Sequence, residues 1–485
     1  MPFAAPAPCR PPVAPLRVGR RASSGVSLGV SLGIAASLAL LGLTATAAAQ
    51  SAPPVRDSAA RADSAARLDS LAARLERAEA ALALLRQEMA AESETAVRTR
   101  SRLSLELSAR VLVNGFFTSR ATNGADVPLV VRAGSGGGSL GISARQTRVG
   151  AALTVRDVAG GIFDGDVDAD FFGGSYDSTG AIPSTPLLRL RTARGWLRWK
   201  RTAVMAGVDT PLISDLNPLS TAAVGLPLFS GAGNLWTWLP QVRVSRELLG
   251  TRLRWAVQGA VLEPSAGAGS GNGYGTQSTV DAGERSRRPA LEGRLRARWG
   301  REDDDAPPNA DVRDAPVGEG PSEIGVGVHR GWVAGPPGVT YASRAVAIDA
   351  RVVLAPRVEL RGEAYRGTLV AGLGGGAIAQ GFGQPGVTGG GYVYAVARPL
   401  TDGAGWAQLD VRPTEFVVAG AGCGVDVVRT AERPVRQRNT ACAAHIEWRP
   451  VQPLLLGLEY RRTVTGYQSG SFGADHVNLA LGFEI

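Results

Sequence analysis

The sequence contains little of the side-chain chemistry on which most enzymes and metal sites depend. Of its 485 residues, only three are histidine and three are cysteine. His329, His445 and His476 fall on different predicted hairpins, whereas a hydrolytic enzyme would need a nucleophile or a water-activating group beside its histidine. No zinc-ligand spacing and no phosphate-binding G-x-x-x-x-G-K motif occurs. These absences argue against an enzyme, against catalytic residues, and against a bound metal or other cofactor.

Lysine is also almost absent, because Lys200 is the only one, and arginine supplies nearly all the positive charge. The formal net charge of the whole chain is +9. Removing residues 1–49 takes away four of the 52 basic residues and none of the 43 acidic ones, so the net charge falls to +5. So small an excess, in a chain that carries an export signal, argues against nucleic acid as a partner.

The first 49 residues have the organisation of a secretory signal peptide. Four arginines precede the apolar run 26–43, and Ala47-Ala48-Ala49 offers a cleavage site before Gln50. A membrane-anchoring helix is the alternative interpretation. Export would place Cys423 and Cys442, the two cysteines beyond the signal, in a compartment where disulfides form.

Residues 57–94, between predicted linkers at 50–56 and 95–102, have a helical period. Apolar residues alternate by three and four, as in a heptad seam, at Leu68, Leu71, Leu75, Ala78, Leu82, Leu85 and Met89. A lone helix of this kind would expose a leucine stripe to water, so the segment is predicted to be a coiled-coil stalk that pairs with copies of itself. Packing of the helix against its own barrel is the alternative, and contact with the cell wall is a possible role for the stalk.

From residue 103 to 485 the period changes to two. In LEGRLRARWG (291–300) one face carries Leu291, Leu295 and Trp299, and the other carries a row of charges. Successive side chains of a strand point to opposite faces, so segments of this kind are predicted to be strands with one apolar and one charged face. Sixteen strands are predicted, at 103–118, 143–157, 161–174, 187–199, 202–209, 238–248, 251–262, 287–300, 320–332, 342–354, 357–370, 404–412, 414–425, 441–449, 453–466 and 474–485.

The connections between these strands alternate between short and long, which is typical of outer-membrane barrels with tight periplasmic turns and long outer loops. An acidic insert at 301–319 is an exception, because it falls where a short turn is due. Trp199, Trp299 and Trp448 end strands that run toward the short turns, as in an interfacial girdle. The prediction is an all-β, sixteen-stranded antiparallel transmembrane barrel with a periplasmic N-terminal stalk, embedded in the lipid bilayer and lipopolysaccharide of the outer membrane.

Three early segments resemble the DcaP-like trimeric porins and, more loosely, the phosphate-selective porins. They are FDGDVDADFFGG (163–174), LLRLRTARGWLRW (187–199) and VMAGVDTPLISDLNP (204–218). A coiled coil before a sixteen-stranded barrel is also similar to that family, although such barrels usually end in Phe and this chain ends in Ile485. The resemblance implies a homo-oligomer, specifically a trimer, that passes small anionic solutes.

Strand parity places two sets of charged residues on the inner wall of the predicted barrel. The predicted basic pore-lining residues are Arg243, Arg252, Arg254, Arg294, Arg296, Arg298 and Arg361, and Arg189 and Arg191 start another run whose register slips near Gly195. The predicted acidic pore-lining residues are Glu106, Asp349, Glu359, Glu363 and Glu459. A basic ladder facing an acidic patch would create a transverse field that favours anions. Alternatively, the arginines only solvate the wall and pair with the acids.

Two further features complete the predicted site. The connection 210–237 is mostly apolar and is too long to lie free in water. It is predicted to fold into the lumen as a constriction loop that holds Asp215 and Asn217 toward the arginines, or else to pack at a subunit interface. Cys423 and Cys442 are a disulfide candidate, which requires a bulge near Gly422–Gly424 because their parities differ in the predicted register.

The function predicted from these observations is an outer-membrane diffusion channel for small, preferentially anionic, hydrophilic solutes, with an arginine-lined pore narrowed by 210–237. The alternative is a structural barrel that is anchored through its coiled coil and conducts little.

Overall fold

The protein is described by a computed structural model. It describes residues 103–173, 187–248, 250, 252–267, 280–300, 315–384 and 398–485. The sequence predictions that lie outside these residues are the signal peptide 1–49, the linkers 50–56 and 95–102, the stalk 57–94 and the part 301–314 of the acidic insert.

Seventeen strands form a single sheet in the described chain. Their bounds are β1 Leu103–Thr118, β2 Ser139–Ser143, β3 Arg148–Val158, β4 Gly161–Gly173, β5 Leu187–Arg198, β6 Thr202–Asp209, β7 Leu239–Glu247, β8 Leu253–Leu262, β9 Ala290–Trp299, β10 Ser322–Ala334, β11 Thr340–Ala355, β12 Val358–Thr368, β13 Thr401–Thr414, β14 Val417–Val428, β15 Arg436–Trp448, β16 Leu454–Tyr467 and β17 Gly470–Glu484. The short helices are η2 Glu284–Ser286, η3 Val370–Leu373, α3 Gly376–Ala379 and η4 Thr430–Glu432. Within the described ranges, no helix has the length and apolar character needed to cross a membrane.

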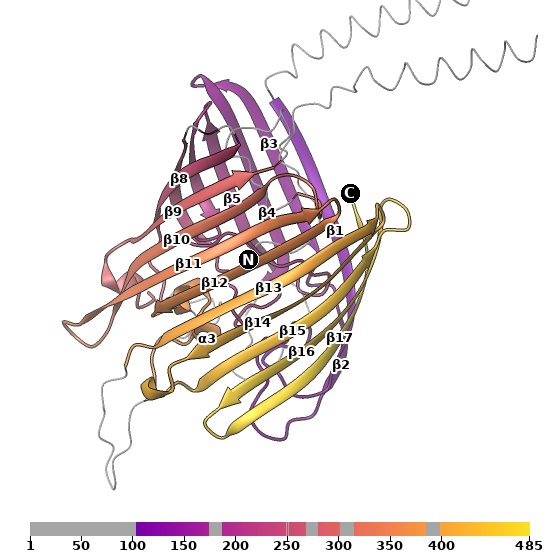
Figure 1. The fold of residues 1–485 in the computed structure, drawn as a ribbon. Helices are drawn as coiled ribbons and strands as arrows, with labels where there is room; N and C mark the ends of the chain where they lie inside the picture. The colour runs from indigo at the N-terminus through magenta and orange to yellow at the C-terminus, as the bar shows by residue number, and fades with distance from the viewer. Residues whose placement is uncertain are drawn as a thin grey trace, which may run out of the picture. The chain divides into compact units, whose positions relative to one another are not determined.

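The sheet closes on itself, because β1 pairs antiparallel with β17 from Arg110↔Glu484 to Thr118↔His476. On its other side β1 pairs with β2 and β3, which share one place in the wall and are separated by residues 144–147. Seventeen strands therefore occupy sixteen places in an antiparallel barrel, and Figure 1 shows β17 lying beside β1. This closure confirms the predicted barrel and strand number.

Side chains alternate between the two faces of the wall as the sequence predicts. On β9, Leu291, Leu295 and Trp299 are exposed on the outside. The charged residues between them, including Arg294 and Arg298, are buried toward the inside. Because the outward residues are apolar on strand after strand, the outer surface suits hydrocarbon and the inner surface suits water.

The tryptophans predicted for a girdle lie at the short-turn ends of their strands. Trp299 and Trp448 are the last residues of β9 and β15, and both are exposed on the outer face. The indole N–H of Trp199, directly after β5, donates a hydrogen bond to the carbonyl of Ala159 at 3.1 Å. These positions suit amphipathic rings at a membrane interface.

Two details of strand register differ from the prediction. The slip expected near Gly195 lies earlier, because the β4–β5 pairing shifts between Asp168↔Thr192 and Ala169↔Leu190. No bulge occurs near Gly422–Gly424, since the β14–β15 register is continuous from Val417 to Val427. The predicted register of these two strands was wrong, and the disulfide candidate needs no irregularity.

Cys423 and Cys442 are bonded to each other and lie directly opposite in the β14–β15 register. Cys423 is exposed and shares the outer face with Val427, and Cys442 shares that face with Ile446. The bridge therefore joins neighbouring strands on the outside of the wall and closes a loop with a sequence separation of 19.

Replacing Val257 with arginine tests which face of the wall meets lipid. Val257 lies in the middle of β8 and points outward with 48% of its side chain exposed. Arginine on the lipid face near the bilayer midplane costs about 2–4 kcal/mol. We expect Val257→Arg to lower the free energy of unfolding from lipid vesicles by this amount and Val257→Leu to leave it unchanged. Equal stability of both variants would show that this face does not contact hydrocarbon.

Removing the disulfide tests its contribution to stability. Closing a loop of about this length lowers the conformational entropy of the unfolded chain and thereby stabilises the folded state by about 3 kcal/mol. We expect the double variant Cys423→Ala/Cys442→Ala to lose this amount in denaturant unfolding of the detergent-solubilised protein. Reductant should lower the parent protein to the stability of the variant and leave the variant unchanged.

Candidate functional site

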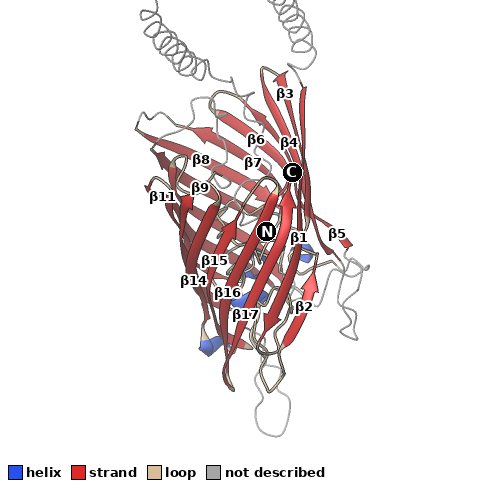
Figure 2. Cartoon of the chain, turned by 90° about the vertical axis from the view of Figure 1, so that its right-hand side faces the viewer, coloured by secondary structure: helices blue, strands red, loops and turns tan. Residues whose placement is uncertain are grey.

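The connection between β6 and β7, residues 210–238, lies inside the barrel and is called the inner segment below. Its backbone N–H groups donate to side chains of the barrel wall. The N–H of Ile213 donates to Glu292 of β9 at 2.9 Å, and that of Leu219 donates to Gln408 of β13 at 2.6 Å. Figure 2 shows loop segments enclosed by the strands. The inner segment is thus held across the lumen by polar groups of the wall.

Apolar packing also holds the inner segment in place. Leu212, Ile213 and Leu235 are fully buried in a cluster with Ala345 and Ala347 of β11. A second cluster places Leu228 and Phe229 of the segment against Trp406 of β13 and Ala441 and Ala443 of β15. The apolar composition of the segment therefore has a structural reason, because its side chains cover part of the inner wall.

Glycines in the wall let the inner segment approach closely. A Cβ atom at Gly327 of β10 would collide with the carbonyl oxygen of Ile213, and one at Gly424 of β14 would collide with that of Ala232. Any other residue at these two positions would push the segment away from the wall.

Two other described segments also enter the lumen. Residues 127–131 are buried, and the carbonyl of Leu129 accepts a hydrogen bond from Asn439 of β15 at 2.8 Å. Residues 369–379, which include η3 and α3, place buried Leu373 in the same cluster as Leu212. The glycine-rich stretch 371–376 is therefore packed inside the barrel.

The predicted basic residues of β9 lie in a network of ion pairs. Arg294 contacts three carboxylates, lying 3.4 Å from Asp215, 3.3 Å from Glu323 and in direct contact with Asp349. Arg298 also binds Glu323, and Arg296 lies 3.8 Å from the same carboxylate. Because Glu323 is on β10 and Asp349 on β11, acids and bases occupy neighbouring strands.

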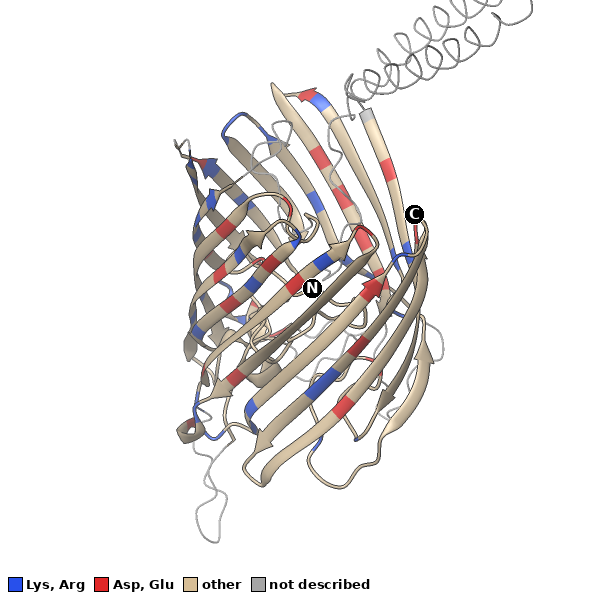
Figure 3. Ribbon diagram, turned by 45° about the vertical axis from the view of Figure 1, so that its right-hand side comes forward, with Lys and Arg blue, Asp and Glu red and all other residues tan. Residues whose placement is uncertain are grey.

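This arrangement corrects the expectation of a basic ladder facing an acidic patch across the pore. Asp349 was expected to face the arginines from elsewhere, but it binds Arg294 on the same wall. Figure 3 likewise shows basic and acidic bands on adjacent strands. Opposite charges at such short range neutralise much of each other's field, so the transverse field is weaker than the sequence suggested.

The other predicted site residues fall into two groups. Most are buried on the inner wall close to the inner segment. Arg243 donates to the carbonyl of Thr210 at 2.8 Å, and the N–H of Leu235 donates to Glu363 at 3.3 Å. Glu459 accepts a hydrogen bond from the hydroxyl of Ser220. These contacts tie the predicted wall residues to the segment that was predicted to narrow the lumen.

Arg361 connects Glu359, which it binds directly, to the backbone of the inner segment. It lies 3.5 Å from the carbonyl of Asn217, and the side chain of Asn217 accepts a hydrogen bond from Asn234 at 3.0 Å. Asp215 points toward Arg294 and lies 3.9 Å from Arg243. Both constriction-loop residues are thus beside arginines of the wall.

The remaining three predicted residues lie near strand ends at the short-turn side. Arg254 is half-buried on β8 and stands directly opposite Arg298 of β9. Arg252 is exposed in the turn before β8, and Glu106 is exposed near the start of β1. Arg252 and Glu106, which were predicted to line the pore, thus lie close to the ends of their strands and not among the buried residues of the inner wall.

Sequence reasoning missed an acidic ladder on β4. Asp164, Asp166, Asp168 and Asp170 occupy alternate positions and bind arginines of β3 and β5, such as Arg148. Alternate aspartates in DGDVDAD were a readable signal for a charged inner face. They surround the arginines of this wall with negative charge, and none of them is among the acidic residues that were predicted to line the pore.

Carboxylate oxygens of Asp215, Glu323 and Asp349 lie within 4.8 Å of one another, which is the spacing of a cation site. The guanidinium of Arg294 already bonds to all three residues. The guanidinium group of Arg294 therefore occupies the position that a metal ion would need.

Replacing Glu323 with glutamine tests the role of this network. Loss of one partner leaves buried guanidinium groups uncompensated, which costs about 3–5 kcal/mol. We expect Glu323→Gln to lower the unfolding free energy by this amount. Glu415→Gln is the control, because that carboxylate is exposed and lies 4.0 Å from Arg357, where a pair contributes less than about 1 kcal/mol. Similar stability of both variants would contradict the structural role of Glu323.

Comparison with known proteins finds structures with a similar fold but no curated protein with a similar sequence. No protein-family model matches the chain, and no curated protein matches its sequence. The outer membrane channel DcaP of Acinetobacter baumannii superposes with a TM-score of 0.54 at 16% identity, over 80% of this chain and 98% of that one.

Two further porin structures are less similar. An anion-selective porin from Comamonas acidovorans gives a TM-score of 0.45 at 10% identity, over 79% of this chain and 100% of that one. OprB of Pseudomonas putida gives a TM-score of 0.43 at 9% identity, over 81% of this chain and 96% of that one. Together with the closed antiparallel sheet described above, the likeness to DcaP shows that this chain has the sixteen-stranded barrel fold of outer-membrane porins.

Proposed function

We propose that the protein is an outer-membrane channel through which small hydrophilic solutes diffuse. The observation that carries the proposal is a closed barrel with an apolar outer face and a charged inner face. Only a closed barrel or a helix satisfies every backbone group inside a bilayer. A barrel of this strand number leaves a lumen too wide for wall side chains to fill, as in porins.

The inner segment is the proposed constriction. It is bound to β9, β12 and β13 of the wall, and it brings Asp215 close to Arg243 and Arg294. A solute that passes through the barrel would have to move between this segment and the remaining wall.

The proposed preference for anions depends on the guanidinium groups at the short-turn ends of β8 and β9. Arg254 faces Arg298, and Arg296 lies one step further along the same face. Glu323 contacts Arg296 and Arg298 of this group. Fixed charges of one sign raise the local concentration of their counterions. Because much of the wall is ion-paired, the expected preference is modest.

The proposal includes the binding partners and the subcellular location of the protein. The solutes would be small anions, the protein would form a homotrimer, and its barrel would contact the lipid bilayer and lipopolysaccharide. The N-terminal signal would be removed on export, and the coiled coil would extend into the periplasm, where it could contact the cell wall. The support for these parts is the sequence pattern and the porin fold. No nucleic acid and no cofactor enter the proposal.

A structural barrel with little conductance is the second candidate. The observation in its favour is the filling of the lumen by three segments of the described chain, namely 127–131, 210–238 and 369–379. Such a barrel would serve to anchor the coiled coil in the outer membrane.

Single-channel recording separates the two functions. We expect the purified full-length protein to insert into planar bilayers with discrete conductance steps, in groups of three for a trimer. In a salt gradient the reversal potential should be shifted toward the equilibrium potential of the anion. Absence of conductance from protein that is folded in the bilayer would favour the structural barrel.

Neutralising two arginines tests the selectivity. We expect Arg296→Gln/Arg298→Gln to move the reversal potential toward zero, because the variant removes two fixed positive charges from the inner wall. Arg246→Gln is the matched control, since Arg246 is an exposed residue on the outer face of β7 and should not affect ions inside the barrel. An unchanged reversal potential in the double variant would remove these residues from the filter.

A further inference from the structure

Four arginines interrupt the apolar outer face of the barrel near the long-connection ends of β10–β14. Arg330, Arg344, Arg366 and Arg429, called the arginine patch, are exposed on that face. Arg344 has the same parity as Val346 and Ile348, which are exposed, whereas its neighbour Ala345 is buried against the inner segment. These guanidinium groups therefore lie outside the channel, and the proposed transport does not use them.

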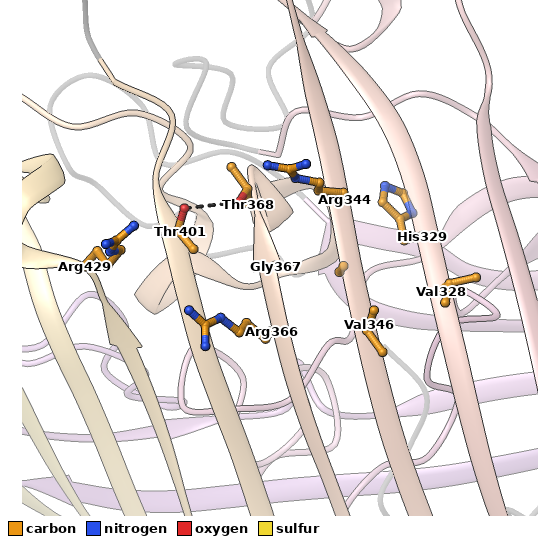
Figure 4. Close-up of a pocket in the computed structure, with 10 residues that line it drawn as sticks. Val328, His329, Arg344, Val346, Arg366, Gly367, Thr368, Thr401 and Arg429 are labelled. Atoms are coloured by element: carbon orange, nitrogen blue, oxygen red, sulfur yellow. Dashed lines mark hydrogen bonds between the residues drawn. The ribbon is translucent and has the colours of Figure 1, made fainter.

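Strand register brings the arginine patch together. Arg330 stands directly opposite Arg344, and Arg344 stands opposite Thr368 of β12. The hydroxyls of Thr368 and Thr401 are 3.1 Å apart, and the N–H of Arg429 donates to the carbonyl of Thr401 at 2.9 Å. Arg344, Arg366 and Arg429 line one hollow of about 530 Å³ together with these threonines, as Figure 4 shows.

Little negative charge balances the arginine patch. The outward-facing positions of β10, β11 and β12 carry no aspartate or glutamate. Within the described chain neither Arg344 nor Arg366 forms an ion pair, and Arg429 reaches only Glu432, at 3.9 Å. By contrast, the outward-facing Arg462 of β16 lies 2.7 Å from Asp475. Like charges directly opposite on neighbouring strands are destabilising, so an anion from outside the chain would stabilise the pair Arg330–Arg344.

The position of the arginine patch fits a membrane interface. Along β11, the outward residues on the short-turn side of Arg344 are apolar from Val346 to Leu354. At about 3.4 Å per residue and a tilt of about 40°, that stretch spans roughly 20 Å of bilayer. Trp332 lies beside the patch, 5.6 Å from the guanidinium of Arg330, and tryptophan is typical of the headgroup level.

We propose that the arginine patch binds the phosphorylated headgroup of a membrane lipid, whose acyl chains lie along the apolar face of β10–β12. Guanidinium groups bind phosphate oxygens in bidentate geometry, and the two threonine hydroxyls add neutral donors. The hollow is continuous with the apolar wall, which a free phosphate would not use. The inference rests on the membrane placement proposed above but not on conduction.

Native mass spectrometry of the full-length protein in mild detergent tests this site. The probe is bis-phosphorylated lipid A, and the comparison lipid is the same molecule without its phosphates. We expect the phosphorylated lipid to bind the parent protein and Arg344→Gln/Arg366→Gln to bind it at least about tenfold more weakly, because two charge-assisted hydrogen-bond donors are lost. Arg462→Gln, which removes an outward-facing arginine that already has a carboxylate partner, should bind like the parent.

Four results would overturn the proposal. The first is equal binding of the dephosphorylated lipid, the second is displacement of the lipid by inorganic phosphate at comparable concentration, and the third is unchanged affinity in the double variant. A variant that loses its oligomeric state but not its lipid affinity would instead mark the patch as a contact between copies and would also refute it.

Two controls keep the result interpretable. Folding of the double variant into lipid vesicles shows that it is folded and inserted, so loss of lipid binding with normal folding supports the site. Failure of all variants and the parent to insert would refute the membrane placement rather than the site alone. If the double variant does not fold, Arg366→Gln alone provides the same comparison.

Discussion

The hydrogen bonds between β1 and β17 are the constraint on which the rest of this structure depends. They join residues that are far apart in the sequence, from Arg110 and Glu484, which are 374 positions apart, to Thr118 and His476, which are 358 positions apart. Without them the sheet would expose two unpaired edges, which hydrocarbon cannot satisfy. With them, each residue of the wall must face either outward or inward. The chemical difference between the two faces is therefore a consequence of closure.

Closure also determines how the interior is filled. A wide lumen leaves inner side chains without neighbours across the barrel, and this chain supplies them from its own long connections. The inner segment contacts β9, β12 and β13 through its backbone and packs its apolar residues on β11 and β15. Glycines such as Gly327 and Gly424 make room for it. The same segments that narrow the lumen thus hold opposite walls together.

Charge is handled differently on the two faces. Inside, arginines such as Arg294 meet carboxylates on adjacent strands, which reduces the cost of burying each charge and also weakens the field that a solute would feel. Outside, few acidic residues lie near the arginine patch, which is the proposed site for lipid headgroups. The inner arginines consequently have a structural role besides the selectivity proposed for them, whereas the outer ones can bind an anionic partner.

The sequence by itself determined the barrel. A period of two, read over LEGRLRARWG and its counterparts, predicted the strands, their faces and their number, because side-chain alternation is a local property of extended backbone. It also predicted that the apolar segment 210–237 could not lie in water. What the tertiary structure decided was which residues of neighbouring strands lie opposite each other. Arg294 meets Asp349 because β10 brings β9 and β11 together, and Cys423 meets Cys442 because of a register that a shift of one residue would have changed. Such pairings depend on contacts between distant parts of the chain, and local periodicity carries no information about them.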